Sequence, residues 1–118
     1  MKSVLLELID TISARGALVV APDGMLIAAE VREGVDLDRL AALGAAILTG
    51  IGERLASAGL PRFTQVEVAA QEGKVILLEA GPTYLLVLLG ARLEIGPGSI
   101  EIRSAAHRIT REAQLAPS

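Results

Sequence analysis

The sequence predicts an α+β fold, an αββαβββα sandwich whose helices cover both faces of a five-stranded, mainly antiparallel sheet. Its candidate strands come in consecutive groups joined by Gly- and Pro-containing turns, which favours hairpins. The last two strands are apolar at nearly every position, as in strands covered on both faces. Three segments with helical periodicity can supply that cover. A chain of 118 residues is the length of one domain, residues 1–118.

The first part of the chain predicts a helix followed by a hairpin. Apolar residues at helical spacing run from Val4 to Ala14, and Ser3 is the expected N-cap. The apolar segments Ala17–Ala21 and Met25–Val31 flank Pro22-Asp23-Gly24. Proline presets φ and glycine permits a positive φ, so this tripeptide predicts a turn between two antiparallel strands.

The longest helix is expected from Leu37 to Ala58. Asp36 is a suitable N-cap, and Gly59 ends the helical pattern. A spacing of 100° per residue gathers the large apolar residues on one broad side, which we expect to pack on the sheet. This core side consists of Leu37, Leu40, Gly44, Ile47, Leu48, Ile51 and Leu55.

Three strands and a final helix complete the prediction. The strands are Phe63–Ala70, Val75–Ala80 and Tyr84–Leu89, and the helix runs from Ser99 to Leu115. Gly96-Pro97-Gly98 precedes this helix, either as a plain turn or as a cradle whose free N–H groups bind a phosphate. The segment lacks the Lys-Ser/Thr pair of a P-loop, which favours the turn.

Composition excludes several classes of protein. The net charge of −3 and the near absence of aromatic residues argue against nucleic-acid binding. Cysteine is absent and His107 is the single histidine, so one subunit cannot build a Cys/His metal site, and we expect no metal or cofactor. The longest uncharged runs, Leu40–Gly52 and Ala80–Ala91, are shorter than a membrane span. Acidic residues interrupt the N-terminal segment where a signal peptide would be apolar, so we expect a cytoplasmic protein.

The middle helix has an unusual back. Leu40–Gly52 contains no charge, and the side opposite the core carries small residues, flanked by Arg39 and Glu53. These small residues are Ala42, Ala45, Ala46 and Thr49. Small side chains allow a second helix to approach closely, which predicts a two-fold homodimer. An alanine-rich solvent face, or a helix broken within 49–52, would also fit the pattern.

Groups that could support catalysis are scarce. Asp36 and Asp38 suit the cap and the dipole of a helix start, and Glu67 and Glu79 suit solvated strand faces. His107 lies between two arginines on the outer side of the last helix, which favours a solvated basic stripe or a docking site for an acidic partner. These residues predict a protein that is not an enzyme.

Several segments together resemble the roadblock/dynein-light-chain domain family, most closely its bacterial, MglB-like branch. They are Gly16–Ala28 (GALVVAPDGMLIA), Leu40–Ala46 (LAALGAA), Gly73–Leu77 (GKVIL) and Tyr84–Leu89 (YLLVLL). The resemblance covers nearly the whole chain, from Val4 to Ala113.

The resemblance implies a non-enzymatic homodimer that binds a small Ras-like GTPase and, in the bacterial branch, stimulates GTP hydrolysis by that partner. Family members dimerise through the middle helix and an edge strand, here Phe63–Ala70. The dimer interface would then contain Ala42, Ala45, Ala46, Thr49, Phe63, Gln65 and Glu67. The residues that face the GTPase would be Arg39, Glu53, Arg54 and Ser57.

An alternative is a small-ligand-binding sensory domain, because antiparallel sheets flanked by helices often contain pockets. This function needs a polar group buried among apolar neighbours. Thr83 and Tyr84 are the candidates in this sequence. An enzyme subunit with a site shared across a dimer is a weaker alternative, because nucleophiles and metal ligands are lacking.

Overall fold

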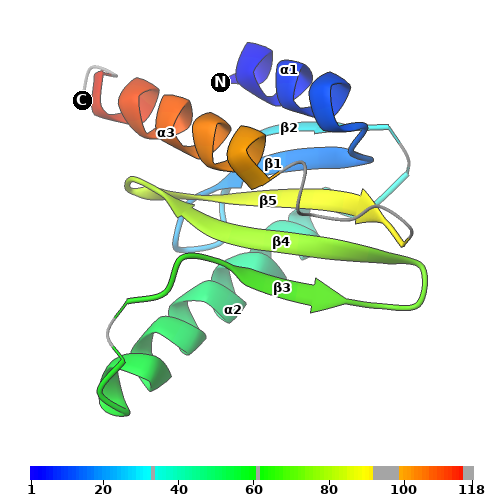
Figure 1. Cartoon of the computed structure of the whole chain (residues 1–118). Coiled ribbons are helices and arrows are strands. Elements are labelled where there is room, and N and C mark those ends of the chain that lie inside the picture. Colours follow the sequence, from blue (N-terminus) through cyan, green and yellow to red (C-terminus); the bar gives the residue numbers. More distant parts are fainter. Residues whose placement is uncertain (33, 61, 92–98, 116–118) are drawn as a thin grey trace.

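The structure has the predicted αββαβββα order (Figure 1). It is a computed structural model that describes residues 1–32, 34–60, 62–91 and 99–115. The expected Gly96-Pro97-Gly98 turn lies outside the described residues. The elements are α1 (Lys2–Ile12), β1 (Gly16–Val20), β2 (Leu26–Val31), α2 (Leu37–Ser57), β3 (Val66–Ala69), β4 (Gly73–Ala80), β5 (Thr83–Gly90) and α3 (Ser99–Leu115).

The five strands form one sheet in the order β2-β1-β5-β4-β3, and every neighbouring pair is antiparallel. The centre of the sheet joins distant parts of the chain, because β1 pairs with β5 and Gly16 lies opposite Leu88. β2 and β3 are the two edges. The predicted antiparallel sheet is confirmed.

Helices cover both faces of the sheet: α1 and α3 lie on one face, and α2 lies on the other (Figure 1). Side chains alternate between these faces along each strand. Val19 and Val87 point into the core under α1 and α3, whereas Leu18 and Leu86 point into the core under α2. The sandwich predicted from strands that are apolar on both sides is therefore confirmed.

Two of the predicted local signals are confirmed. The Asp36 carboxylate accepts a hydrogen bond of 3.1 Å from the Arg39 backbone N–H, so it caps α2. In the turn between β1 and β2, Gly24 has a φ of +93°, and the Met25 N–H donates to the Asp23 carboxylate at 3.0 Å. A residue with a Cβ would be strained at that φ, so glycine fixes the turn.

Predicted boundaries are wrong at both ends of α1 and at the start of β3. Ser3 does not cap α1, because the helix already begins at Lys2, and Ser13 ends it in the left-handed conformation with a φ of 58°. β3 begins at Val66 rather than at Phe63. Phe63 instead packs, half-buried, against the core under α2, so this segment leaves the path of the sheet.

Candidate functional site on the outer side of α2

The side of α2 that faces away from the sheet carries no charge between Arg39 and Glu53. We call this exposed stretch the outer surface of α2; it consists of Ala42, Leu43, Ala46 and Thr49. Leu43 is 55% exposed, which is unusual for a large apolar side chain in the middle of a helix. The helix is continuous through residues 49–52, so the alternative of a break there is excluded.

Ala45, which the sequence predicted on the back of α2, faces the sheet instead. Ala45 is only 2% exposed and packs in the core with Ala41 and Leu48. Gly44 lies directly on Leu86 of β5, where any side chain would collide. This close approach makes the side of α2 around Gly44, including Ala45, face the sheet. Ala45 therefore has little surface left for a second subunit.

A shallow hollow of about 390 Å³ adjoins the outer surface. The turn between β1 and β2 forms one side of it through Pro22 and Asp23, while Ala46 and Glu53 line the helix side. Gly24 allows this turn to approach the helix, since a Cβ there would lie 3.3 Å from Ala42 Cα. The outer surface is thus a ridge of small residues beside a depression, a shape that a partner helix can fill.

The two polar residues proposed for ligand binding are satisfied within the chain. Thr83 is buried, and its hydroxyl donates to the Ala80 carbonyl at 2.8 Å. The Tyr84 hydroxyl forms a 2.9 Å hydrogen bond with the Thr49 hydroxyl. This bond ties β5 to the outer surface of α2, so the hydroxyl groups of Thr83 and Tyr84 each have a partner within the chain.

The four residues expected to face a GTPase are all exposed, but they do not form one cluster. Arg39 lies at the start of α2 and pairs with Asp36 at 3.9 Å, while Glu53, Arg54 and Ser57 lie in its last part. Fourteen residues of helix place Arg39 and Glu53 about 21 Å apart. The Arg54 guanidinium donates to the Gly50 carbonyl at 3.2 Å, within its own helix.

The predicted interface residues beyond α2 lie at and before the edge strand β3. Glu67 is exposed on β3 and pairs with Lys74 of β4 at 3.7 Å. Phe63 and Gln65 are half-buried and precede the strand. β3 is an edge of the sheet, but only its four residues have the extended, paired backbone that a second sheet could continue.

Among the described residues, no group of three or more His, Asp or Glu side chains could hold a metal ion. His107 is exposed on α3, and so are Arg103 and Arg111. Their exposure fits both alternatives drawn from the sequence, a solvated basic stripe and a docking site for an acidic partner.

By length and composition, α2 is also the one helix in the described part of the chain that could cross a membrane. This is weak evidence, because core helices of soluble proteins pass the same test. α2 forms one layer of the fold, and Ala41, Ala45 and Leu48 bury one of its sides on the sheet. In its 18-residue apolar window, 22% is buried within the chain, and Leu37, Leu40 and Ile47 are half-buried against the same core.

Sequence reasoning missed Leu43. It belonged to neither the predicted core side nor the predicted back, although it lies one turn from Ala46. A large apolar residue outside the core arc of an uncharged helix is the signal that could have identified it.

Comparisons with known proteins identify the family. The family sequence model of the Roadblock/LC7 domain matches residues 2–89 of this chain. An uncharacterised protein of Methanocaldococcus jannaschii is 35% identical over 107 residues, which are 90% of each chain. A second uncharacterised protein of that organism is 31% identical over 106 residues, covering 90% of this chain and 93% of the other.

Solved structures share the fold. The gliding protein MglB of Thermus thermophilus has a TM-score of 0.88 at 23% identity, with 97% of this chain and 88% of that chain covered. MglB of Myxococcus xanthus has a TM-score of 0.90 at 20% identity, with 98% and 95% covered. An MglB in a tetrameric arrangement has a TM-score of 0.87 at 23% identity, with 95% and 86% covered. The resemblance drawn from the sequence is confirmed, and the chain belongs to the Roadblock/LC7 domain family.

Proposed function

We propose that this protein is a non-enzymatic, homodimeric scaffold of the cytoplasm that binds a small Ras-like GTPase and regulates it. Membership of the Roadblock/LC7 family and the fold shared with MglB support a role in GTPase regulation. One of the similar MglB structures is a tetrameric arrangement, which supports self-association as the basis of the scaffold.

The observation that carries the proposal is the uncovered outer surface of α2. An apolar patch on a soluble protein is usually an interaction site. Here the exposed Leu43 lies among alanines, and charges appear only beyond the stretch, at Arg39 and Glu53. Such a surface has an uncharged centre and a polar rim, as protein interfaces do.

Two-fold symmetry gives this surface a specific pairing. A dyad perpendicular to α2 would pair two copies antiparallel, with the same patch on both. Ala46 is the midpoint between Arg39 and Glu53, so a dyad at Ala46 brings each Arg39 beside the partner's Glu53. Ala42 then faces Gly50 of the second helix, where neither side chain hinders a close approach.

The GTPase would contact the ends of the paired helices. Arg54 and Ser57 lie beyond the pairing region of one subunit, close to the start of α2 of the second subunit. The dimer would thus unite residues that one chain keeps about 21 Å apart. Dimerisation would therefore be a precondition for binding the GTPase.

Light scattering coupled to size-exclusion chromatography tests the dimer. The expected mass is about 24 kDa, twice the 12.2 kDa of the chain. Ala46→Arg should lower it to the monomer mass, because two arginines would meet at the dyad and each would lose hydration. Ala56→Arg is the matched control, since Ala56 is exposed on the same helix beyond Glu53, and it should remain a dimer. A wild-type mass near 12 kDa at micromolar concentration would refute the dimer.

Binding of the GTPase is tested with the Ras-like GTPases encoded in the same genome, each loaded with GDP or with GTP. We expect co-elution with one of them, and a changed rate of GTP hydrolysis. Arg54→Glu should weaken this binding about tenfold or more while the dimer mass stays unchanged. Arg103→Glu makes the same charge change at an exposed position of α3 and should not weaken binding of the GTPase. Absence of a complex with every GTPase in both states would overturn the proposal.

A further inference from the structure

The outer side of α3 carries a row of basic side chains, Arg103, His107 and Arg111, which we call the basic stripe. All three are exposed, and each stands four residues from the next, so they lie on one side of the helix. Eight residues of helix separate Arg103 from Arg111 by about 12 Å. The sheet lies between α3 and α2 (Figure 1), so this surface does not depend on the function proposed above.

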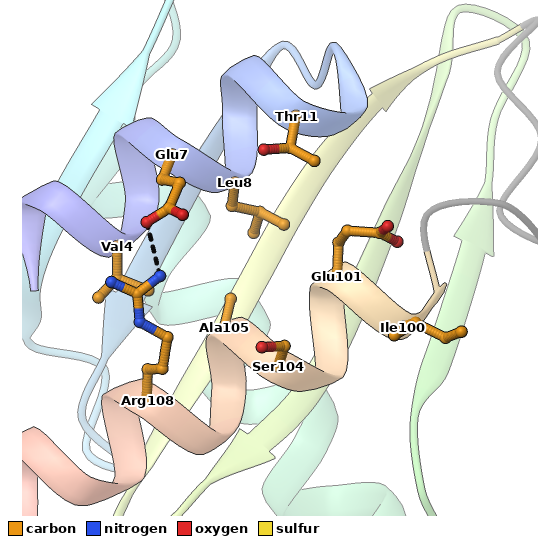
Figure 2. Close-up of a pocket in the computed structure, with 9 residues that line it drawn as sticks. All are labelled: Val4, Glu7, Leu8, Thr11, Ile100, Glu101, Ser104, Ala105 and Arg108. Atoms are coloured by element: carbon orange, nitrogen blue, oxygen red, sulfur yellow. Dashed lines mark hydrogen bonds and ion pairs between the residues drawn. The ribbon is translucent and has the colours of Figure 1, made fainter.

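The basic stripe is not neutralised within the described part of the chain. Its three side chains form no ion pair and no hydrogen bond with other described residues. Arg108 of the same helix differs, because its guanidinium donates to the Glu7 carboxylate of α1 at 2.6 Å. Figure 2 shows this bond crossing from α3 to α1. The cation that faces α1 is therefore paired, whereas those on the outer side are open to a partner.

The acidic residues of α3 are engaged elsewhere. Glu112 pairs with the N-terminal amine of Met1, and one carboxylate oxygen of Glu101 is inaccessible to solvent. Neither glutamate stands three or four positions from a residue of the basic stripe. Opposite charges at that spacing stabilise a surface helix, whereas like charges destabilise it. The stripe thus places like charges where they cost helix stability, which favours a role in recognition over a role in stability.

Two exposed apolar side chains extend the stripe at its ends. Ile100 lies one turn before Arg103 and is 78% exposed, and Leu115 lies one turn after Arg111 and is 79% exposed. Among the described residues, no large apolar side chain is more exposed than these two. Figure 2 shows Ile100 pointing away from the groove between α1 and α3. The surface therefore has a basic centre with an apolar contact at each end, over about 22 Å of helix.

Charge and burial distinguish between the classes of partner. An anionic membrane binds clusters of about four or more Lys and Arg residues, or the apolar side of an amphipathic helix. Here α3 buries its apolar side, Ile102, Ala105 and Ile109, in the core of the fold. A net charge of −3 also repels an anionic membrane or a nucleic acid as a whole. An acidic segment of a protein needs only the local cations, since arginine forms strong, often paired hydrogen bonds with carboxylates.

We infer that the basic stripe binds an acidic helical segment of a partner protein. Carboxylates four residues apart on such a helix repeat about every 6 Å, as the residues of the stripe do. Arg103 and Arg111 donate to the two outer carboxylates, and the ring N–H of His107 donates to the middle one. Apolar side chains at the ends of the segment lie against Ile100 and Leu115. The protein would then have one recognition surface on each side of its sheet.

Nuclear magnetic resonance titration of the full chain tests this inference with a designed peptide. The peptide is an alanine-based helix with three Glu residues spaced four positions apart and one Leu a turn beyond each outer Glu. We expect saturable shifts of the amide signals of α3. The same peptide with Gln in place of Glu should bind about tenfold more weakly, because three exposed ion pairs are lost. Absence of a saturable shift, or equal binding of the Gln peptide, would overturn the inference.

Variants of the protein localise the peptide. Combining Arg103→Gln with Arg111→Gln should weaken peptide binding about fivefold, because two ion pairs are lost. Arg62→Gln is the matched control, since Arg62 is exposed outside α3 and also lacks an ion pair among the described residues, and it should bind as the wild type does. The urea midpoint of the double variant should not fall, because the stripe makes no contact that stabilises the fold. An unchanged peptide affinity, or a lower midpoint, in the double variant would refute the role of the stripe.

Vesicle sedimentation tests the competing occupant, an anionic membrane. The wild-type protein is mixed with vesicles of phosphatidylglycerol or of phosphatidylcholine. We expect it to remain in the supernatant with both, because its net charge is negative. Sedimentation with phosphatidylglycerol that the double arginine variant abolishes would assign the stripe to a lipid surface and overturn the acidic protein partner.

Discussion

Replacing Gly44 by alanine tests why α2 lies where it does. A Cβ at this position would lie well inside contact distance of Leu86 Cδ2, and 3.1 Å from both Leu86 Cδ1 and Leu86 Cγ. Leu86 is fully buried in the central strand, in one core with Leu18, Leu48 and Leu77, so a shift of its side chain would disturb its neighbours. We therefore expect Gly44→Ala to lower the free energy of unfolding.

Two opposing effects set the size of the change. Alanine stabilises a helix interior by about 1 kcal/mol relative to glycine. Forcing an extra methyl group into a packed core costs about 1–3 kcal/mol. The balance is a net loss of about 1 kcal/mol. Gly52→Ala is the matched control on the same helix, because its Cβ would meet Phe63 at an ordinary 3.6 Å. This control should gain about 1 kcal/mol of stability.

Urea denaturation followed by circular dichroism measures both variants, at equal protein concentration because self-association changes apparent stability. A double variant with Leu86→Val identifies the cause. In the Leu86→Val background, adding Gly44→Ala should be neutral or stabilising, because valine lacks the Cδ2 methyl group that would collide. The explanation is refuted if Gly44→Ala stabilises the wild-type protein as much as Gly52→Ala does.

Three smaller changes follow from individual contacts. Asp36→Ala should cost about 1 kcal/mol of unfolding free energy, because the cap of α2 is lost, whereas Asp36→Asn should retain most of it; equal losses in both variants would contradict the cap. Thr49→Val should cost about 1 kcal/mol because the Tyr84 hydroxyl loses its partner, and adding Tyr84→Phe should cost little more; additive losses would mean that the bond contributes nothing. Glu7→Gln should cost less than about 1 kcal/mol, because its ion pair with α3 is largely exposed. A loss above about 2 kcal/mol, measured in the same urea experiment, would mean that this pair organises the two helices.

The order of the elements was predictable because it depends on repeated signals. The apolar runs Val75–Ala80 and Tyr84–Leu89 predicted β4 and β5, and the residues of the turn at Gly24 predicted that turn. The helical spacing of the large apolar residues along α2 likewise predicted Leu48 as a core residue. Such signals persist when one residue departs from the pattern.

The errors occurred where a single contact decides the outcome. Ala45 is small enough for either side of α2, and its burial depends on how closely Gly44 approaches the sheet. Phe63 has a high β-strand propensity, but its ring packs against the core under α2 instead. Ser13 takes a left-handed conformation, which a serine in the sequence does not predict. Each choice depends on tertiary packing, which periodicity along the chain does not record.

The pairing of β1 with β5 has a consequence for how the chain folds during synthesis. The hairpin of β1 and β2 can form early, but its central neighbour is complete only when residue 90 has left the ribosome. Until then the apolar side of α2 lacks β4 and β5, two of the strands that it contacts. Contacts so distant along the chain slow folding, and the nascent chain is prone to aggregate meanwhile. The uncharged helix α2 would thus make the unfinished chain a client for chaperones.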